Sequence, residues 1–480
     1  VVSSQLINSD IVLGVTGGAS TGYQFNNAST GGATLTVAGN VMGGSGGTAG
    51  AKTLTLLGVG GGTLSGSITN GGATSLSVTI SSGTWTLSGP SSTFGGATFT
   101  QNAITYTRST QINGPATVLI GSNSALGTGD LNISGASAAT FQALTGDRAL
   151  PQSIILTGDS SFTTTGSYSI SLAGKLVFNG SVAITNNIAG AGKTLTIGGN
   201  VEVRNATTNF SRTITFNGSG TTILNGPVVN NDPSISSLTV GSLAYTGSGT
   251  LKSTAANTYT GTTSVGFGGT YLVNGSHSSA TVGNYTVNGT LGGTGTITPS
   301  GVNSVTVGAS GALSPGDSTL ATNSQTGTLA IGNTINLNGG SVVMQIGGAA
   351  PGNGQGFYDQ LNMTNVAGAV NLNGVVFLSL SLVNGFAPSG SDIFYIVSRA
   401  DAGSFFTFFD GTTEGGTVDL GGGVTGQITY LADWTGTQGG SSLTGGNDIA
   451  IYNVAVPEPA VIGLVAFGLI AMVLRKRRIA

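Results

Sequence analysis

Residues 75–80 read SLSVTI, a run in which leucine, valine and isoleucine alternate with small hydroxylated side chains. Successive side chains of a β-strand point to opposite faces, so this alternation predicts a strand with one buried and one exposed face. The pattern returns at residues 53–57 (TLTLL), 194–197 (TLTI) and 213–216 (TITF). Glycine, asparagine or serine bounds each run, and these residues favour tight turns. The sequence therefore predicts short strands joined by turns.

The strands recur over most of the chain with monotonous turn residues, and no charged or proline-rich linker separates them. This spacing is compatible with a β-sandwich, a barrel or a β-solenoid. We favour a solenoid, because each coil is one repeating unit and stacking of the coils buries their inward residues. With roughly 20 residues to a coil and about 4.8 Å between coils, about 17 coils would form a rod of ~80 Å before residue 345.

Composition narrows the class of protein. Of 480 residues, 85 are glycine and 38% are hydrophobic, but only 6% are charged. The hydrophobic content is sufficient to bury a core of many thin layers. Up to Ala455 there are nine basic and fifteen acidic residues, and no basic patch, so we do not expect nucleic-acid binding. The absence of cysteine excludes disulfides and thiolate metal sites.

The texture of the sequence changes near residue 346, where aromatic and acidic residues become frequent. We therefore divide the chain into a β-solenoid at 1–345, a smaller β-domain at 346–455 and a tail at 456–480. Exposed ends of solenoids need a cap, and the smaller domain is expected to supply it. Aromatics between residues 394 and 409 are expected in the core of this cap rather than against a bound sugar.

One part of the solenoid has a repeat that is specific enough to compare with a known family. The relevant segments are 249–251 (GTL), 257–263 (NTYTGTT), 269–275 (GTYLVNG), 289–297 (GTLGGTGTI) and 311–318 (GALSPGDS). Residues 244–318 resemble the autotransporter-associated β-strand repeat. This resemblance implies a right-handed parallel β-helix of the kind found in autotransporter passengers.

The tail has three elements in a fixed order. They are Pro457, Glu458 and Pro459, then the fifteen apolar residues 460–474, then Arg475, Lys476, Arg477 and Arg478. A charge-free apolar segment with a basic cluster predicts a membrane-inserted helix whose basic end is cytoplasmic. At about 1.5 Å per residue, its length of roughly 22 Å is short for a hydrocarbon core of about 30 Å. We therefore expect a single transmembrane helix at 460–474 that anchors the protein transiently.

These three elements resemble the PEP-CTERM sorting signal of exported bacterial proteins. The resemblance implies export, a stay in the inner membrane, and cleavage near Pro457, Glu458 and Pro459 by an exosortase-type processing enzyme. Proteins with this signal occur in bacteria that make exopolysaccharide. The sequence begins Val1-Val2 without a basic leader, so we expect a mature N-terminus or a fragment.

Candidate catalytic residues are sparse. Residues 1–345 contain seven acids: Asp10, Asp130, Asp147, Asp159, Glu202, Asp232 and Asp317. None is adjacent to another or one residue removed, although glycoside hydrolysis needs two nearby carboxylates. Acids about one coil apart, such as Asp130 and Asp147, leave a pair open, but we expect the acids in solvated turns. The only histidine, His277, is expected in an exposed turn, and one histidine cannot form a zinc triad.

We therefore predict no catalytic residue, no cofactor and no metal ligand. Residues 445–448 (GGND) are similar to one copy of a calcium-binding repeat that normally needs tandem copies, so calcium near Asp448 is left open. The predicted function is that of an exported structural or adhesive protein of the cell surface or extracellular matrix, in contact with polysaccharide. Two alternatives remain: a polysaccharide-active β-helix lyase or hydrolase, and a fragment of a larger secreted adhesin.

Overall fold

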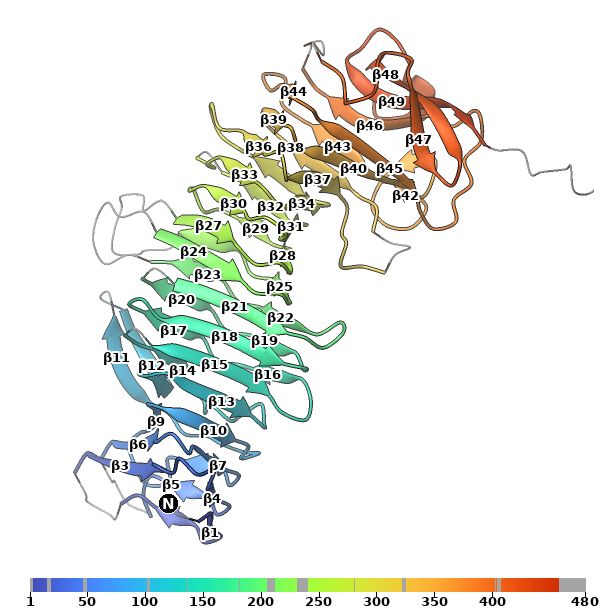
Figure 1. Ribbon diagram of the computed structural model, residues 1–480. Coiled ribbons are helices and arrows are strands. Elements are labelled where there is room, and N and C mark those ends of the chain that lie inside the picture. The colour runs from blue at the N-terminus through green and yellow to red at the C-terminus, as the bar shows by residue number, and fades with distance from the viewer. Residues whose placement is uncertain are drawn as a thin grey trace, which may run out of the picture.

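The computed structural model of the chain is all-β, with short strands stacked into long parallel sheets along an elongated body (Figure 1). It describes residues 3–14, 19–45, 50–101, 104–135, 137–180, 182–204, 212–230, 241–279, 281–321, 325–401, 403 and 407–456. Within these ranges the helical structure is the 3-10 turn η2 (Gln438–Gly440). The long parallel sheets agree with the predicted β-solenoid.

The longest sheet has fifteen strands, and its neighbouring strands belong to successive coils. Its strands are β1 (Gln5–Ile7), β4 (Leu35–Val37), β7 (Gly62–Leu64), β10 (Gly83–Leu87), β13 (Ala116–Ile120), β15 (Ala138–Ala143), β18 (Ser161–Gly166), β21 (Val182–Ile188), β24 (Arg212–Asn217), β27 (Gly241–Tyr245), β30 (Thr263–Val265), β33 (Tyr285–Val287), β36 (Val305–Val307), β39 (Ile335–Asn338) and β44 (Val370–Asn373). All fourteen pairings along it are parallel.

Two further sheets complete most of the coils. The ten-stranded sheet holds β3 (Thr21–Asn26), β6 (Lys52–Leu57), β9 (Leu76–Ile80), β12 (Ile104–Ile112), β14 (Asp130–Ile133), β17 (Ile154–Thr157), β20 (Leu176–Asn179), β23 (Val201–Val203) and β26 (Val228–Asn230), with β11 (Ala97–Gln101) paired to β12. The twelve-stranded sheet holds β16 (Arg148–Leu150), β19 (Ile170–Leu172), β22 (Thr194–Ile197), β25 (Thr221–Leu224), β28 (Thr250–Ser253), β31 (Thr270–Val273), β34 (Thr290–Gly293), β37 (Ala312–Pro315), β40 (Ser341–Ile346), β42 (Phe357–Tyr358), β41 (Ala350–Pro351) and β45 (Phe377–Leu382).

The remaining strands form two smaller groups. At the N-terminal end, β2 (Ile11–Val12), β5 (Val41–Met42) and β8 (Ile68–Thr69) make a three-stranded sheet. A nine-stranded sheet holds β29 (Ala256–Asn257), β32 (Ser276–Ser278), β35 (Thr296–Thr298), β38 (Thr328–Ile331), β43 (Gln360–Met363), β46 (Phe394–Arg399), β49 (Asp448–Ala455), β48 (Val424–Ala432) and β47 (Thr417–Gly421).

The length of a coil varies along the stack. Strand pairing places Leu243 against Thr263 and Tyr285 against Val305, which is 20 residues per coil. By contrast, Gly83 pairs with Ala116, 33 residues further on. The expected coil of about 20 residues therefore holds only where the repeat was recognised. Long insertions elsewhere reduce the strands of the fifteen-stranded sheet that precede residue 345 to fourteen, fewer than the predicted 17 coils.

The core is a set of columns in which inward residues of successive coils stack in register. One column runs through Ile184, Phe216, Tyr245, Val265, Val287, Val307, Leu337 and Leu372, all buried. Burial of apolar surface contributes roughly 25 cal/mol per Å², and each coil covers the inward residues of its neighbours. The alternation seen in the sequence is therefore the source of the core.

Parallel pairing continues beyond residue 345, since β40 pairs with β45 and β43 with β46. From β46 onward, β49, β48 and β47 pair antiparallel. These antiparallel strands lie at the C-terminal end of the stack (Figure 1). The division at residue 345 falls within the last turn of β40, and the separate capping domain remains a prediction. Phe394, Tyr395 and Phe409 are buried there.

The tail residues 457–480 lie outside the described ranges, so the transmembrane helix at 460–474 has no structural support. Among the residues that the structure describes, no helix is long and apolar enough to cross a membrane.

His277 corrects an expectation. It is fully buried on β32, where its register partners are Asn257 and Ile297, rather than in an exposed turn. Its ring stacks on Tyr259 with 3.9 Å between centroids, and its Nδ1 lies 2.5 Å from the Tyr285 hydroxyl oxygen. Its Nε2 lies 2.7 Å from the Tyr259 carbonyl oxygen. Burial lowers the pKa of His277 to about 4, so the ring is neutral. The position is an inward one, and that decides its environment.

Candidate functional site

Charged and aromatic side chains gather on the outer face of the ten-stranded sheet. The gathering arises from β12, whose first half pairs antiparallel with β11 while its second half joins the parallel sheet. The resulting hairpin packs Tyr106 against outward-facing Ile155 and Val177. We call the surrounding group the charged patch; it consists of Tyr106, Arg108, Asp130, Lys175, Glu202 and Arg204.

Glu202 is the centre of the charged patch. Its side chain has no exposed surface, and its carboxylate lies 2.8 Å from Lys175 Nζ and accepts hydrogen bonds from the Arg204 guanidinium. Arg204 also donates to the Tyr106 hydroxyl at 2.8 Å. Burial alone would raise the pKa of Glu202, but the hydrogen bonds from Lys175 and Arg204 hold it below the ordinary value. Glu202 is therefore an ionised anchor and is poorly suited to donate a proton.

The other acids of residues 1–345 do not converge. Asp10, Asp147 and Asp159 are exposed, Asp130 is half-buried at the start of β14, and Asp232 lies outside the described ranges. The solvated turn expected for every acid is wrong for Glu202 and Asp317, which are buried. Cationic partners explain both cases, because burial of an unpaired carboxylate is costly. No group of three His, Asp or Glu residues that could hold a metal ion occurs in the described ranges.

A second polar region lies on the outer face of the twelve-stranded sheet. Threonines of five successive coils occupy equivalent positions there: Thr194, Thr221, Thr250, Thr270 and Thr290. After β37 the chain turns away at Gly316, whose φ of +97° is a conformation that glycine adopts without strain. Gly316 exchanges backbone hydrogen bonds with Gly293, at 2.8 and 2.9 Å, and the following segment returns at Gln325.

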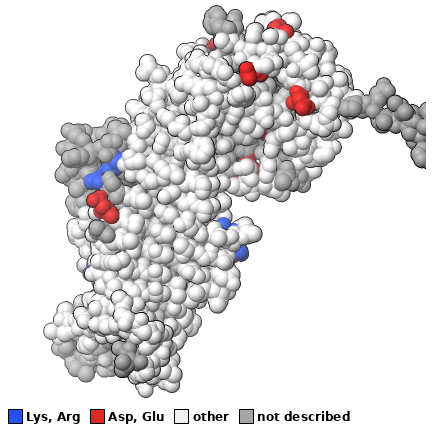
Figure 2. Space-filling view, in the orientation of Figure 1, with Lys and Arg blue, Asp and Glu red and all other residues white. Residues whose placement is uncertain are grey.

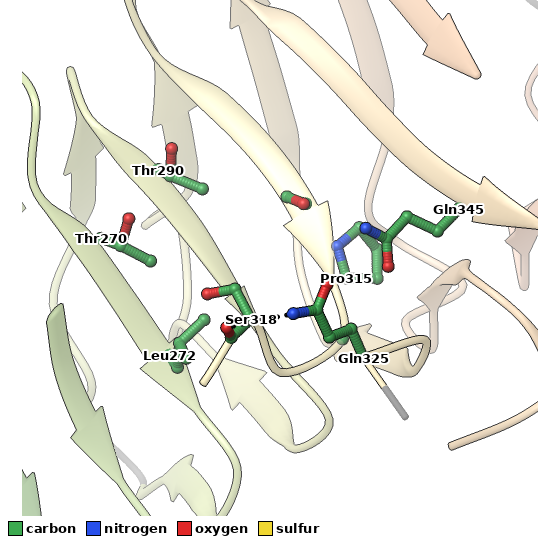
Figure 3. Close-up of a pocket in the computed structure, with 9 residues that line it drawn as sticks. Thr270, Leu272, Thr290, Pro315, Ser318, Gln325 and Gln345 are labelled. Atoms are coloured by element: carbon green, nitrogen blue, oxygen red, sulfur yellow. Dashed lines mark hydrogen bonds between the residues drawn. The ribbon is translucent and has the colours of Figure 1, made fainter. Parts of the chain in front are cut away.

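This returning segment encloses a hollow of about 140 Å³ against the sheet, which we call the groove (Figure 3). Thr270, Leu272, Thr290, Ser314, Ser318 and Gln345 are among the residues that line it. Figure 3 shows the side chains of Thr270, Thr290 and Gln345 on neighbouring strands, with Ser318 and Gln325 on the segment that covers them. The groove therefore combines side chains from several coils with one loop.

Asp317 fixes the loop beside the groove. Its buried carboxylate accepts from Lys252 Nζ and Asn274 Nδ2, both at 2.6 Å, and from the Thr319 backbone N–H at 2.9 Å. Burial opposes ionisation, but the hydrogen bond from Lys252, followed by those from Thr319 and Asn274, holds the pKa of Asp317 below its ordinary value. Lys252 and Asp317 thus neutralise each other, and the side chains that line the groove carry no charge.

The calcium hypothesis concerned Asp448. Its two carboxylate oxygens accept the backbone N–H groups of Arg399 and Trp434, each at 2.6 Å. Burial raises the pKa of Asp448. Both oxygens therefore have structural partners that join β46, β49 and the segment after β48.

The seven predicted processing residues, Pro457, Glu458, Pro459, Arg475, Lys476, Arg477 and Arg478, lie outside the described ranges. Sequence reasoning did not predict the groove, although its wall includes the recognised segment 311–318. The available signal was the threonine that recurs at equivalent positions, together with a loop that breaks the repeat.

Comparison with known proteins gives no match for this chain among protein-family models, curated proteins or solved structures. The two resemblances drawn from the sequence therefore remain predictions.

Proposed function

We propose that the chain is an exported bacterial protein of the cell surface or extracellular matrix, with a structural or adhesive role and no enzymatic activity. The observation that carries this proposal is the ordered tail: Pro457-Glu458-Pro459, then apolar residues 460–474, then the basic cluster 475–478. The long parallel sheets support the proposal, since the autotransporter-type repeat implies such a body. We further propose that the β-helix is right-handed and that residues 346–455 cap it.

Each element of the tail has a proposed part in sorting. The apolar segment forms a transmembrane helix at 460–474, and Arg475, Lys476, Arg477 and Arg478 hold its end on the cytoplasmic side. The two prolines start the helix just downstream and leave an extended segment open to an exosortase-type enzyme. The short span makes the inner-membrane stage transient. Cleavage near Pro459 then releases the body to the surface.

The surface of the body suits contact through many weak bonds. Figure 2 shows one face that is almost entirely uncharged, with small groups of charge and several acids towards the C-terminal end. The strand alternation places threonine and serine on outward positions of the coils, as in the threonine series of the twelve-stranded sheet. Their hydroxyls both donate and accept hydrogen bonds, as extracellular polysaccharide does. An adhesive role in an exopolysaccharide matrix or biofilm follows from this chemistry.

The sorting proposal is tested by removal of residues 457–480 in the producing bacterium. We expect the full chain at the cell surface or in the medium, and the truncated chain held in the cell envelope. The matched control is full-length Thr221→Val, which changes one outward hydroxyl and leaves the tail intact. Identical distribution of the full and truncated chains would contradict the proposal.

A polysaccharide-active enzyme is the second candidate, and the charged patch favours it, because Tyr106, Lys175 and Arg204 lie together on an outer face of a parallel sheet. Glu202 binds both cations, which argues against a free catalytic acid there. Incubation of the full chain with uronate polymers, followed by detection of unsaturated or reducing ends, separates the candidates. Turnover that Glu202→Gln or Lys175→Ala abolishes would favour the enzyme.

A further inference from the structure

The size of the groove limits what it can hold. Its volume is about 140 Å³. Because a water molecule in the liquid occupies about 30 Å³, the groove has room for roughly four or five waters. Pockets for drug-sized ligands typically measure about 300–1,000 Å³. A single sugar ring therefore suits the groove, whereas a nucleotide or an acyl chain is too large.

The groove presents hydrogen-bonding groups that the protein does not use. Within the described ranges, no side-chain hydrogen bond is made by Thr270, Thr290, Ser314, Ser318 or Gln345. Hydroxyl and amide side chains both donate and accept, which matches the hydroxyls of a sugar. Leu272 and Pro315 add apolar surface that can cover the carbon face of a ring.

Charge decides between sugar classes. The nearest cation, Lys252, is held at 2.6 Å by Asp317 and also donates to the Thr319 hydroxyl at 3.1 Å. A uronate or sulfated sugar would therefore find no free cation in the groove, and its desolvation would be uncompensated. A neutral sugar meets no such cost.

The groove is also formed before any ligand arrives. Gly293 and Gly316 tie the loop to β34, and the Asp317 carboxylate ties it to Lys252 and Asn274. Binding therefore does not have to order the loop, which removes one of the usual entropic costs.

We infer that the groove binds one ring of a neutral saccharide, and that Thr270 and Thr290 supply hydrogen bonds to its hydroxyls. This inference deepens the proposed adhesive role and rests on it for its biological meaning. The site would give the body one defined contact with a neutral polysaccharide among many weak ones.

Ligand-observed NMR with the full chain tests the inference. The probes are D-glucose, D-galactose, D-mannose and cellotetraose, with D-glucuronate and D-galacturonate as anionic comparisons, each at about 10 mM, where millimolar affinity is visible. We expect at least one neutral probe to bind, with little dependence on salt. The double variant T270V/T290V keeps the shape of both side chains and should weaken binding at least tenfold. Thr221→Val, on the same series of threonines outside the groove, should bind within twofold of the native chain.

Three results would overturn the inference: no neutral probe binds, the uronates bind as well as the neutral sugars, or the double variant binds like the native chain. Unchanged thermal unfolding of T270V/T290V shows that any loss is local. Cell fractionation tests the proposed function separately. A surface protein that ignores neutral sugars defeats this inference alone, and a sugar-binding protein that stays inside the cell defeats the proposed function.

Discussion

The charged patch and the groove use polar side chains in opposite ways. In the charged patch, Glu202 is buried and binds Lys175 and Arg204, so its charges are committed to one another. In the groove, the hydroxyls of Thr270 and Thr290 have no partner within the described ranges. In a chain with 6% charged residues, the charges of the patch and of the Asp317 loop fix parts of the fold, and neutral hydroxyls remain available for contact.

The strongest challenge to this comparison is Glu202→Ala. Removal of the carboxylate leaves Arg204 buried without its ionic partner, and loss of one member of a buried pair costs about 3–5 kcal/mol. We expect a loss of this size in urea denaturation. Lys175→Ala is the matched control; its side chain is 50% exposed, so we expect a loss of about 1 kcal/mol or less. Equal effects of the two substitutions would show that the patch is not a structural anchor.

The buried His277 extends the comparison to the inside of the stack and predicts a pH dependence. Its pKa is about 4 in the folded chain and 6.5 ordinarily, so the unfolded chain takes up the proton first as the pH falls. Stability should therefore decrease between about pH 6.5 and pH 4, by about 3 kcal/mol in total.

Urea midpoints measured from pH 7 to pH 4 on the native chain and on His277→Phe check this expectation. The difference between the two chains is the relevant quantity, because burial raises the pKa of Asp359 to about 8 and gives an opposite slope over part of the range. The native chain should lose stability relative to the variant as the pH falls. Parallel curves would show that His277 is not buried and neutral.

Asp317→Ala tests whether the loop and the groove depend on one carboxylate. The substitution removes the acceptor for Lys252 and Asn274 and should destabilise the chain by about 2 kcal/mol. Limited proteolysis should then cut within residues 316–321, where the native chain resists. Asp317→Asn keeps one acceptor oxygen and should lie between the two. Native-like resistance of Asp317→Ala would contradict the assigned role.

The smallest effect on stability is expected for T270V/T290V. Both positions are outward and β-branched before and after the change, so the free energy of unfolding should change by less than about 0.5 kcal/mol. Thermal unfolding beside Thr221→Val measures it. A large loss would mean that these hydroxyls stabilise the fold, and the contrast with the charged patch would disappear.

The sequence predicted the all-β fold and the parallel stack because alternation at residues 75–80 and its repeats directly encodes the inward and outward faces. It did not predict coil length, since the insertion between β10 and β13 leaves the strand pattern intact. The burial of His277 was missed because its partners Tyr259 and Tyr285 lie 18 and 8 residues away. The groove was missed for a similar reason: it depends on the register of threonines from separate coils.

The most direct test of the account is mass spectrometry of the C-terminus of the native protein, recovered separately from the medium, the cell surface and the inner membrane. The account predicts that extracellular molecules end near Pro459 and lack Arg475–Arg478. An intact tail, found only on protein in the inner membrane, would contradict it.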